Sequence, residues 1–508
     1  MSISFLEYLP PLRPTTPIDY AVGFLNILFH ILVQTAPHTG GWRFFRATVA
    51  APLISAVWLY LAFVPEAVGN YDQWGIPILF VGFIFRTYEL LVLFPGETHT
   101  HRITMRSPPI TDRLKSSSKN TPTTHFIPEQ VPAPFTLAKF YWATSLWWSF
   151  RGVGWNYCCP LPSSSRRVPY VRGSSRREYF ITRLKFLALA YLWYDAMRTI
   201  MNLTTARHFF HPNPSLSYQD LSIGQTALYS IIVVSRVWYG LNHSHVTVAL
   251  FFVGLGGLLG WEGEIWSPWG WPPLFGNFKE LWKHPGVSTM WSRTWQGYNR
   301  RWLYVFGWIG ISENILKLTH TGLSSHPSVP PDTLSSANTP SLSGQVSPNH
   351  PLPTTPINLP AKRMTTRLML QNLIKSIVVF ALSGLQHDCG TLHLLRKTHS
   401  LKLISWRYVL ALSPFFVVQP LALAVEALWK ALWRGQKARW CLMWKLHGQP
   451  EWLTFTERLL GFIWTWVWLG WSARWFIVGT VRAGAYWSQE GEVYPSIIGG
   501  LIYRKWLH

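Results

Sequence analysis

Apolar runs long enough to cross a lipid bilayer recur along most of this chain, separated by short polar or basic segments. The first three runs cover residues 18–36, 47–64 and 76–94, and proline, glycine or a charged residue bounds each of them. A transmembrane helix needs about 20 mostly apolar residues. We therefore expect the chain to open with three membrane-spanning helices.

Further apolar runs predict more helices. Residues 135–150 mix aromatic side chains with a lysine and predict a helix that lies in the membrane interface. Longer candidates lie at residues 184–201, 222–239, 243–259, 375–396, 401–425 and 459–480, with the shorter segment 302–311 left open. Little polar sequence separates 222–239 from 243–259, which predicts an antiparallel hairpin. The pattern predicts an all-α, polytopic integral membrane protein with about eight to ten transmembrane helices around a buried chamber.

Three polar or irregular segments interrupt these runs. Residues 96–134 form a polar, basic loop, and residues 321–366 are a Ser/Thr/Pro-rich tract with few apolar side chains, so we expect a disordered insertion there. Residues 261–284 are irregular, and such backbone survives at membrane depth only when it is buried in protein or lines a wet cavity. The chain therefore divides into five parts. They are the N-terminal helices (1–95), the basic loop (96–134), a first part of the membrane core (135–320), the insertion (321–366) and a second part of the membrane core (367–508).

Composition also favours a membrane protein. Hydrophobic residues make up 48% of the chain and charged residues 13%, about half the charged fraction of soluble proteins. The formal net charge is +23, but the basic residues lie mostly between apolar runs, which favours contact with anionic lipid over nucleic acid. The four cysteines form neither a zinc-ligand pattern nor a disulfide framework. The adjacent Cys158 and Cys159 are either ordinary interfacial thiols or a palmitoylation site.

The segment FALSGLQHDC, residues 380–389, carries the most informative polar side chains. His387 and Asp388 interrupt an apolar helix, and ionisable groups at membrane depth are costly and usually functional. A helix over residues 375–396 would be about 32 Å long, with His387 just past its middle. We interpret His387 as either a general base in a sheltered cavity or a structural hydrogen-bonding residue. Adjacent helical positions point about 100° apart, so we expect Asp388 to bind a neighbouring helix.

Other ionisable residues in the apolar runs favour structural roles. Arg86 and Glu89 are three positions apart on one helical face, and we expect them to form an ion pair. Asp195 and Glu313 are buried-acid candidates, for which structural pairing is favoured over catalysis. Cys389 carries no sequence signal of a reactive thiolate, so we leave it out of the site.

Three sequence elements, in this order, resemble the motifs of a known family. They are WPPLFG at residues 271–276, MWSRTWQG at 290–297 and SGLQH at 383–387, and RGVGWNY at 151–157 extends the match. Together they resemble the wax synthase-like branch of the membrane-bound O-acyltransferases, in its fungal secondary-metabolite acetyltransferase form. The resemblance covers residues 151–396, most of the predicted membrane core.

The resemblance implies an enzyme that transfers an acyl group, expected to be acetyl, from acyl-CoA to a hydroxyl of an apolar small molecule such as a terpenoid. It implies His387 as the base. The family motif commonly has histidine after tryptophan, whereas this chain has Gln296 after Trp295. We expect the Gln296 amide either to donate to the thioester carbonyl or to form an interhelical hydrogen bond. Asn299, three residues on and on the same helical face, is the reserve candidate.

The resemblance also implies partners and a location. Acyl-CoA is the expected cosubstrate, with Arg293, Arg300 and Arg301 as phosphate contacts or interfacial anchors, and neither a tightly bound cofactor nor a metal is expected. Residues 1–17 lack the apolar core of a cleaved signal peptide, and the endoplasmic reticulum is the expected membrane. Two alternatives stay open: a long-chain wax ester synthase acting on fatty alcohols, and a non-catalytic transporter or lipid-binding protein in which His387 lines a pathway.

Overall fold

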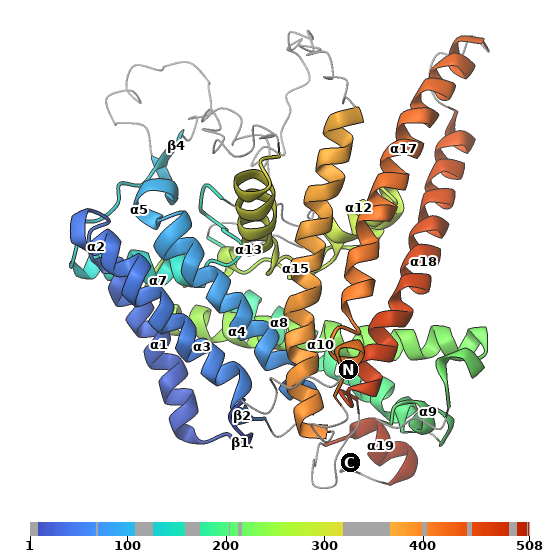
Figure 1. The fold of residues 1–508 in the computed structure, drawn as a ribbon, viewed down its shortest axis with the longest axis horizontal. Coiled ribbons are helices and arrows are strands. Elements are labelled where there is room, and N and C mark those ends of the chain that lie inside the picture. Colours follow the sequence, from blue (N-terminus) through green and yellow to red (C-terminus); the bar gives the residue numbers. More distant parts are fainter. Residues whose placement is uncertain are drawn as a thin grey trace.

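The computed structural model shows a mostly helical chain whose described part has strands only in two short pairs (Figure 1). β1 (Arg13–Pro14) pairs with β2 (Pro65–Glu66), and β3 (Ile103–Arg106) pairs with β4 (His125–Pro128). The structure describes residues 9–67, 70–106, 125–157, 173–202, 204–211, 216–318, 366–398, 404–443, 450–486, 495–504 and 506.

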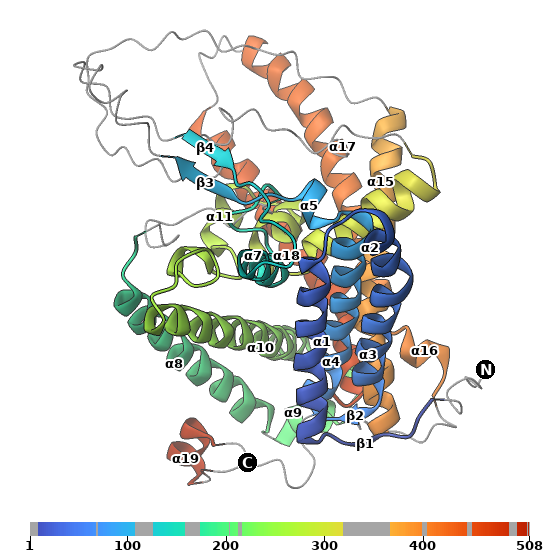
Figure 2. The same cartoon turned by 90° about the vertical axis from the view of Figure 1, so that its left-hand side faces the viewer.

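The three apolar runs expected at the start of the chain are confirmed as helices long and apolar enough to span a membrane, and they lie side by side (Figures 1 and 2). Trp58 and Phe83 pack in their shared buried core, with ring centroids 5.0 Å apart. In chain order the elements are α1 (Pro17–Thr35), then α2 (Gly40–Phe45), the π-helical turn η2 (Arg46–Ala50) and α3 (Ala51–Phe63) joined end to end, and then α4 (Asn70–Tyr88) continued by the π-helical turn η3 (Glu89–Leu93).

Two long helices, α8 (Arg176–Met201) and α10 (Ile223–Leu258), pack together and cross the direction of this bundle (Figures 1 and 2). α10 is one continuous helix of 36 residues, so the hairpin expected over 222–259 is wrong. No proline separates the two apolar runs. The polar Asn242 between them stays in the helix, because its Nδ2 donates to the backbone oxygen of Trp238 at 2.9 Å.

A second group of helices contains His387. α15 (Thr366–Thr398) confirms the helix expected at 375–396 and extends it at both ends. It packs against α4, α17 (Ser413–Met443) and the π-helical segment η7 (Tyr304–Ile315). α18 (Glu451–Arg482) lies beside α17 (Figure 1). α15 thus joins the N-terminal bundle to the C-terminal helices.

Six helices of the described residues are long and apolar enough to cross a membrane. They are α1, the joined segment Gly40–Phe63, α4 with η3, α10, α15 and α17. The expected number of about eight to ten spans is not confirmed, since α8 and α18 are long but are not among the six. The six helices indicate a membrane protein.

Short elements connect the long helices. The segment 261–284 is irregular, as expected, with only a 3-10 turn and one short helix in it. The insertion expected at 321–366 lies outside the described residues apart from its last position, and so do Cys158 and Cys159. The remaining elements are α5 (Gly96–His99), α7 (Leu137–Trp148), α9 (Thr204–Phe209), η4 (Tyr218–Asp220), η5 (Pro268–Gly270), α11 (Phe278–Lys283), α12 (Val287–Thr289), η6 (Met290–Thr294), α13 (Arg300–Leu303), α16 (Trp406–Val409) and α19 (Ile497–Tyr503).

The buried acids expected to be structural have basic or backbone partners. Arg86 Nη1 lies 2.9 Å from Glu89 Oε2, with both side chains fully buried, which confirms that pair. Lys375 Nζ lies 2.6 Å from Glu313 Oε1, joining α15 to η7. Asp195 accepts hydrogen bonds from the Ser496 hydroxyl and the Ile498 backbone at the start of α19, at 2.6 and 2.8 Å.

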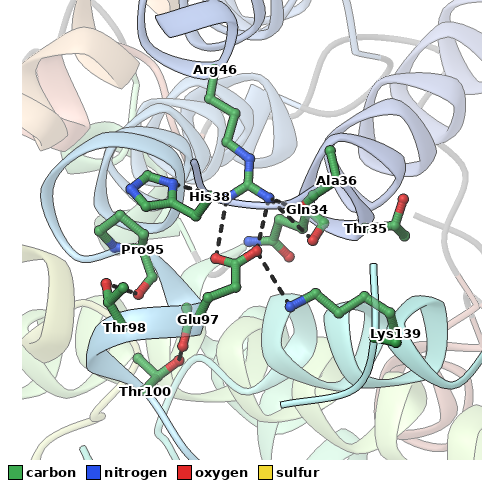
Figure 3. Close-up of polar contacts among 12 residues, drawn as sticks. Gln34, Thr35, Ala36, His38, Arg46, Pro95, Glu97, Thr98, Thr100 and Lys139 are labelled. Atoms are coloured by element: carbon green, nitrogen blue, oxygen red, sulfur yellow. Dashed lines mark hydrogen bonds and ion pairs between the residues drawn. The ribbon is translucent and has the colours of Figure 1, made fainter. Parts of the chain in front are cut away.

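A further buried charge cluster joins α5 to the N-terminal bundle (Figure 3). Arg46 donates through both Nη atoms to the Glu97 carboxylate, at 3.1 and 2.8 Å, and Lys139 Nζ lies 3.3 Å from the same group. Burial alone would raise the pKa of Glu97, but hydrogen bonding and charge attraction from Arg46 and Lys139 outweigh it and lower that pKa. One carboxylate therefore compensates two buried cations.

We expect Glu97→Gln to destabilise the fold by about 3–5 kcal/mol, because it leaves Arg46 and Lys139 buried without a counter-charge. Thermal unfolding of the purified protein in detergent measures this loss as a lowered Tm. The matched control is Glu451→Gln, an exposed carboxylate at the start of α18, for which we expect a much smaller change. Equal losses of Tm in the two variants would contradict the structural role of Glu97.

Candidate active site

His387 lies where four helices meet. Its ring is half-buried on α15, and rings from three other helices surround it. Between ring centroids, Phe416 of α17 is 4.5 Å away, Trp74 of α4 is 6.1 Å away and Phe476 of α18 is 6.4 Å away. We call Trp74, Phe416 and Phe476 the aromatic cage. The cage places the imidazole among side chains of the bundle and not on its outer surface.

One hydrogen bond determines which nitrogen of the imidazole carries the proton. Nδ1 of His387 lies 2.7 Å from the backbone oxygen of Ser383, one helical turn earlier. A carbonyl oxygen only accepts, so Nδ1 is the protonated nitrogen of the neutral ring. Nε2 then carries the lone pair, and it makes no hydrogen bond to any described residue. The ring therefore has one basic nitrogen without a partner among the described residues.

Two glycines let the neighbouring helices approach α15 near His387. A Cβ on Gly384 would lie 2.9 Å from the Ser413 hydroxyl oxygen of α17. A Cβ on Gly390 would lie 2.2 Å from the backbone oxygen of Trp74 in α4. These close approaches bring the cage residues of α17 and α4 against the turn that bears the imidazole. A side chain at either glycine would push a wall of the aromatic cage away.

The residues on either side of His387 attach α15 to its neighbours. Asp388 accepts hydrogen bonds from the Leu412 backbone at 3.1 Å and from the Ser413 hydroxyl, at the start of α17. This confirms that Asp388 binds a neighbouring segment, and it makes no hydrogen bond to the imidazole. Gln386 donates through Nε2 to the Ile78 backbone oxygen of α4 at 2.7 Å. Both contacts fix the helix that positions the histidine.

Gln296 lies in a non-helical loop after the π-helical turn η6. The backbone at Trp295 is extended, with φ −73° and ψ 160°, which ends that turn. Gln296 Oε1 accepts from the Tyr298 backbone N–H at 2.7 Å, and its Nε2 makes no hydrogen bond to a described residue. Asn299 is the N-cap of α13, so the helical face that Gln296 and Asn299 were expected to share does not exist. The Gln296 amide is held by its oxygen, with its donor end unused.

The π-helical turn η6, which precedes the Gln296 loop, packs on the same side of α15 as His387. Trp291 of η6 contacts Phe380 of α15 and Phe415 of α17, with centroids 5.6 and 6.0 Å apart. Phe380 is seven residues before His387, on the same helical face and about 10 Å along the axis. The two motif segments therefore converge on one side of α15, although they lie far apart in the sequence.

The three arginines predicted to contact coenzyme A occupy different environments. Arg301 donates through Nε to Glu89 at 2.6 Å and completes the buried pair with Arg86. Arg300 donates to the backbone oxygens of Trp291 and Trp295, both at 3.0 Å. Arg293 is exposed and makes no hydrogen bond or ion pair with a described residue. Among the three arginines, only the Arg293 guanidinium has no partner among the described residues.

Sequence reasoning missed a buried histidine that supports the Gln296 loop. His245 of α10 has Nδ1 2.5 Å from the Tyr298 hydroxyl and Nε2 3.1 Å from the Pro272 backbone oxygen. Since that carbonyl only accepts, Nε2 is protonated and the tyrosine hydroxyl donates to Nδ1. The available signal was an ionisable side chain inside an apolar run. Tyr298 thus binds Gln296 through its backbone and His245 through its side chain.

The cluster around His245 has little free space. Arg151 Nη1 donates to the backbone oxygens of Pro272 and Pro273, both at 2.9 Å, so the segments 151–157 and 271–276 meet here. A cavity of about 30 Å³ lies beside Arg151, His245 and Tyr298, about the share of one water molecule in the liquid. We therefore interpret this cluster as a support for the Gln296 loop and not as a substrate site.

Comparison with curated proteins finds similarity to fungal transferases. The chain is 24% identical over 304 residues to the O-mevalon transferase macI of Penicillium terrestre, covering 58% of this chain and 60% of that protein. It is 23% identical over 304 residues to the acetyltransferase sirH of Emericella nidulans, covering 58% of this chain and 55% of that one. An acetyltransferase of Arthrobotrys oligospora is 26% identical over 174 residues, 33% of each chain. The chain thus matches 60% or less of the length of these relatives.

No protein-family model matches the chain, and no solved structure matches it significantly. The matched relatives are all named as transferases, two of them as acetyltransferases. Six helices of the described residues have the length and composition of membrane spans. The chain is thus similar, over part of its length, to proteins named as fungal transferases, and it has the helices of a membrane protein.

Proposed function

We propose that this chain is a membrane-bound O-acyltransferase that moves an acyl group from acyl-CoA to a hydroxyl of an apolar small molecule. The observation that carries the proposal is the His387 imidazole, whose Nδ1 is fixed by the Ser383 carbonyl and whose Nε2 has no described partner. A neutral histidine held in this tautomer is a general base with one available nitrogen. The similarity to transferases supports the same chemistry.

In this proposal His387 Nε2 takes the proton of the acceptor hydroxyl as its oxygen attacks the thioester carbonyl carbon. The new C–O bond forms, the C–S bond breaks, and the imidazolium returns the proton to the departing coenzyme A thiolate. The positive charge on the ring is stabilised by the hydrogen bond from Nδ1–H to the Ser383 carbonyl, since a hydrogen bond from a charged donor is stronger than one from a neutral donor. No other reactant is needed.

Gln296 is the proposed donor to the thioester oxygen. Its Oε1 is occupied by the Tyr298 backbone, which leaves both Nε2 hydrogens for an acceptor. A fixed amide donor is effective where negative charge develops in the transition state, because it needs no reorganisation at that moment. Asn299, whose side chain does not cap its own helix, stays the reserve donor.

The aromatic cage is proposed to exclude water from the reacting groups. Trp74, Phe416 and Phe476 present apolar rings to His387 from three helices. Exclusion of water strengthens the electrostatic contacts and prevents hydrolysis of the thioester. For the cosubstrate, the exposed Arg293 is the proposed phosphate contact. An acetyl group, a terpenoid or other secondary-metabolite acceptor and the endoplasmic reticulum complete the proposal by analogy to the named relatives and the resembled family.

We expect membranes containing His387→Ala to lose ester formation, because no other basic nitrogen occupies the cage. The assay supplies isotope-labelled acetyl-CoA and a long-chain acyl-CoA together with candidate terpenoid and fatty alcohols, and mass spectrometry identifies the ester. An acetyl ester supports the proposal, whereas a long-chain ester assigns the chain as a wax ester synthase. The matched control is His393→Ala on the same helix, whose ring bonds the Pro65 carbonyl and Gln73.

Activities in this test are compared per amount of folded protein. His393→Ala is expected to keep turnover, since its ring has structural partners outside the cage. Unchanged ester yield in His387→Ala would contradict the proposal. If wild-type membranes form no ester with any donor and alcohol pair, the transporter or lipid-binding alternative replaces it.

We expect Gln296→Ala to lower kcat by about 10²–10³-fold, the usual loss when one donor to a developing oxyanion is removed. KM for acyl-CoA should change little, because the contact strengthens in the transition state. Asn299→Ala is the matched control and is expected to retain turnover. Steady-state kinetics in detergent measures both variants, and the reverse result, with loss only in Asn299→Ala, would move the donor role to Asn299.

A further inference from the structure

A pocket much larger than the space beside His245 lies among the ends of four helices. Its volume is about 520 Å³, and it is bounded by the C-terminal ends of α15 and α18, by α16 and by the start of α17. Figure 2 shows α16 beside the end of α15. Pockets that hold small molecules commonly measure about 300–1,000 Å³. Trp475 lines this pocket, whereas the next residue, Phe476, faces His387. The pocket is therefore distinct from the aromatic cage.

The lining carries positive charge without a compensating acid. Arg407 of α16 and Arg482 at the end of α18 line the pocket, and no carboxylate is among the described residues that do. Neither arginine makes a hydrogen bond or an ion pair with a described residue. Lys375, by contrast, is paired with the buried acid Glu313. Two guanidinium groups on one pocket favour a phosphate, which each can bind through two parallel hydrogen bonds.

The rest of the lining is aromatic and aliphatic. Trp406, Tyr408 and Leu410 line the pocket and are 45%, 44% and 38% exposed, and Trp475 of α18 lines it as well. The pocket lies at the ends of the candidate spans α15 and α17, the depth at which tryptophan, tyrosine and arginine meet lipid head groups. A soluble anion needs no apolar wall of this kind, whereas the glycerol and upper acyl chains of a lipid do.

We propose that this pocket binds an anionic phospholipid. Its phosphate lies between Arg407 and Arg482, and its glycerol backbone and upper acyl chains cover Trp406, Tyr408 and Trp475. Charge complementarity selects an anionic lipid over a zwitterionic one, because no carboxylate lines the pocket to balance a positively charged head group. The proposal is independent of the acyl transfer proposed above, since it concerns neither His387 nor Gln296.

The test measures lipid retained by the purified full-length chain in native mass spectrometry. The protein in detergent is supplied with equal amounts of phosphatidylglycerol and phosphatidylcholine. We expect the wild type to retain one phosphatidylglycerol in preference, and Arg407→Gln/Arg482→Gln to weaken that retention by about tenfold or more. Arg407→Lys/Arg482→Lys keeps the charge but loses the planar guanidinium group. We expect its retention of phosphatidylglycerol to be intermediate between that of the wild type and that of the glutamine variant.

The matched control is Arg367→Gln/Arg434→Gln, which removes the same charge from two exposed arginines outside the pocket. It is expected to retain the lipid as the wild type does. Equal losses in the two glutamine variants would show general charge attraction and overturn the proposal. Equal retention of phosphatidylcholine, or tight binding of glycerol 3-phosphate alone, would overturn it as well. Tm values of all variants verify that each is folded.

Discussion

The hydrogen bond from His387 Nδ1 to the Ser383 carbonyl is the interaction on which the whole site depends. A helical carbonyl has two lone pairs, so the Ser383 oxygen can accept both its backbone partner and the imidazole. The contact fixes the tautomer and the ring orientation without any polar side chain, at 2.7 Å. On either side of His387, Gly384 and Gly390 let α17 and α4 pack closely against α15. The part of α15 that orients the imidazole is therefore also the part against which α17 and α4 pack closely.

The cost of unpaired charge inside a membrane protein separates structural from functional residues in this fold. Glu89 is shared by Arg86 and Arg301, so these three stabilise the core. By contrast, Gln296 Nε2 and the Arg293 guanidinium have no partner among the described residues. Polar groups without a protein partner are the ones that a substrate can bind. The same reasoning underlies the phospholipid proposed at the α16 pocket.

Local sequence predicted what depends on local periodicity and charge. The N-terminal helices, the helix of His387 and the Arg86–Glu89 pair follow from apolar runs and i,i+3 spacing. The aromatic cage did not follow, because its rings come from three helices that are distant in sequence. The helical position expected for Gln296 failed because an extended residue ends a π-helical turn there, and α10 stayed whole because no proline interrupts it.

The most direct test of the central claim is the reactivity of the imidazole itself. Diethyl pyrocarbonate modifies an unprotonated, accessible imidazole nitrogen, and peptide mass spectrometry locates the modified histidine. The account predicts modification of His387 in the native protein, suppressed by a non-hydrolysable acyl-CoA analogue, while His245, both of whose ring nitrogens have protein partners, stays unmodified. Absence of modification at His387, or modification that the analogue does not reduce, would contradict it.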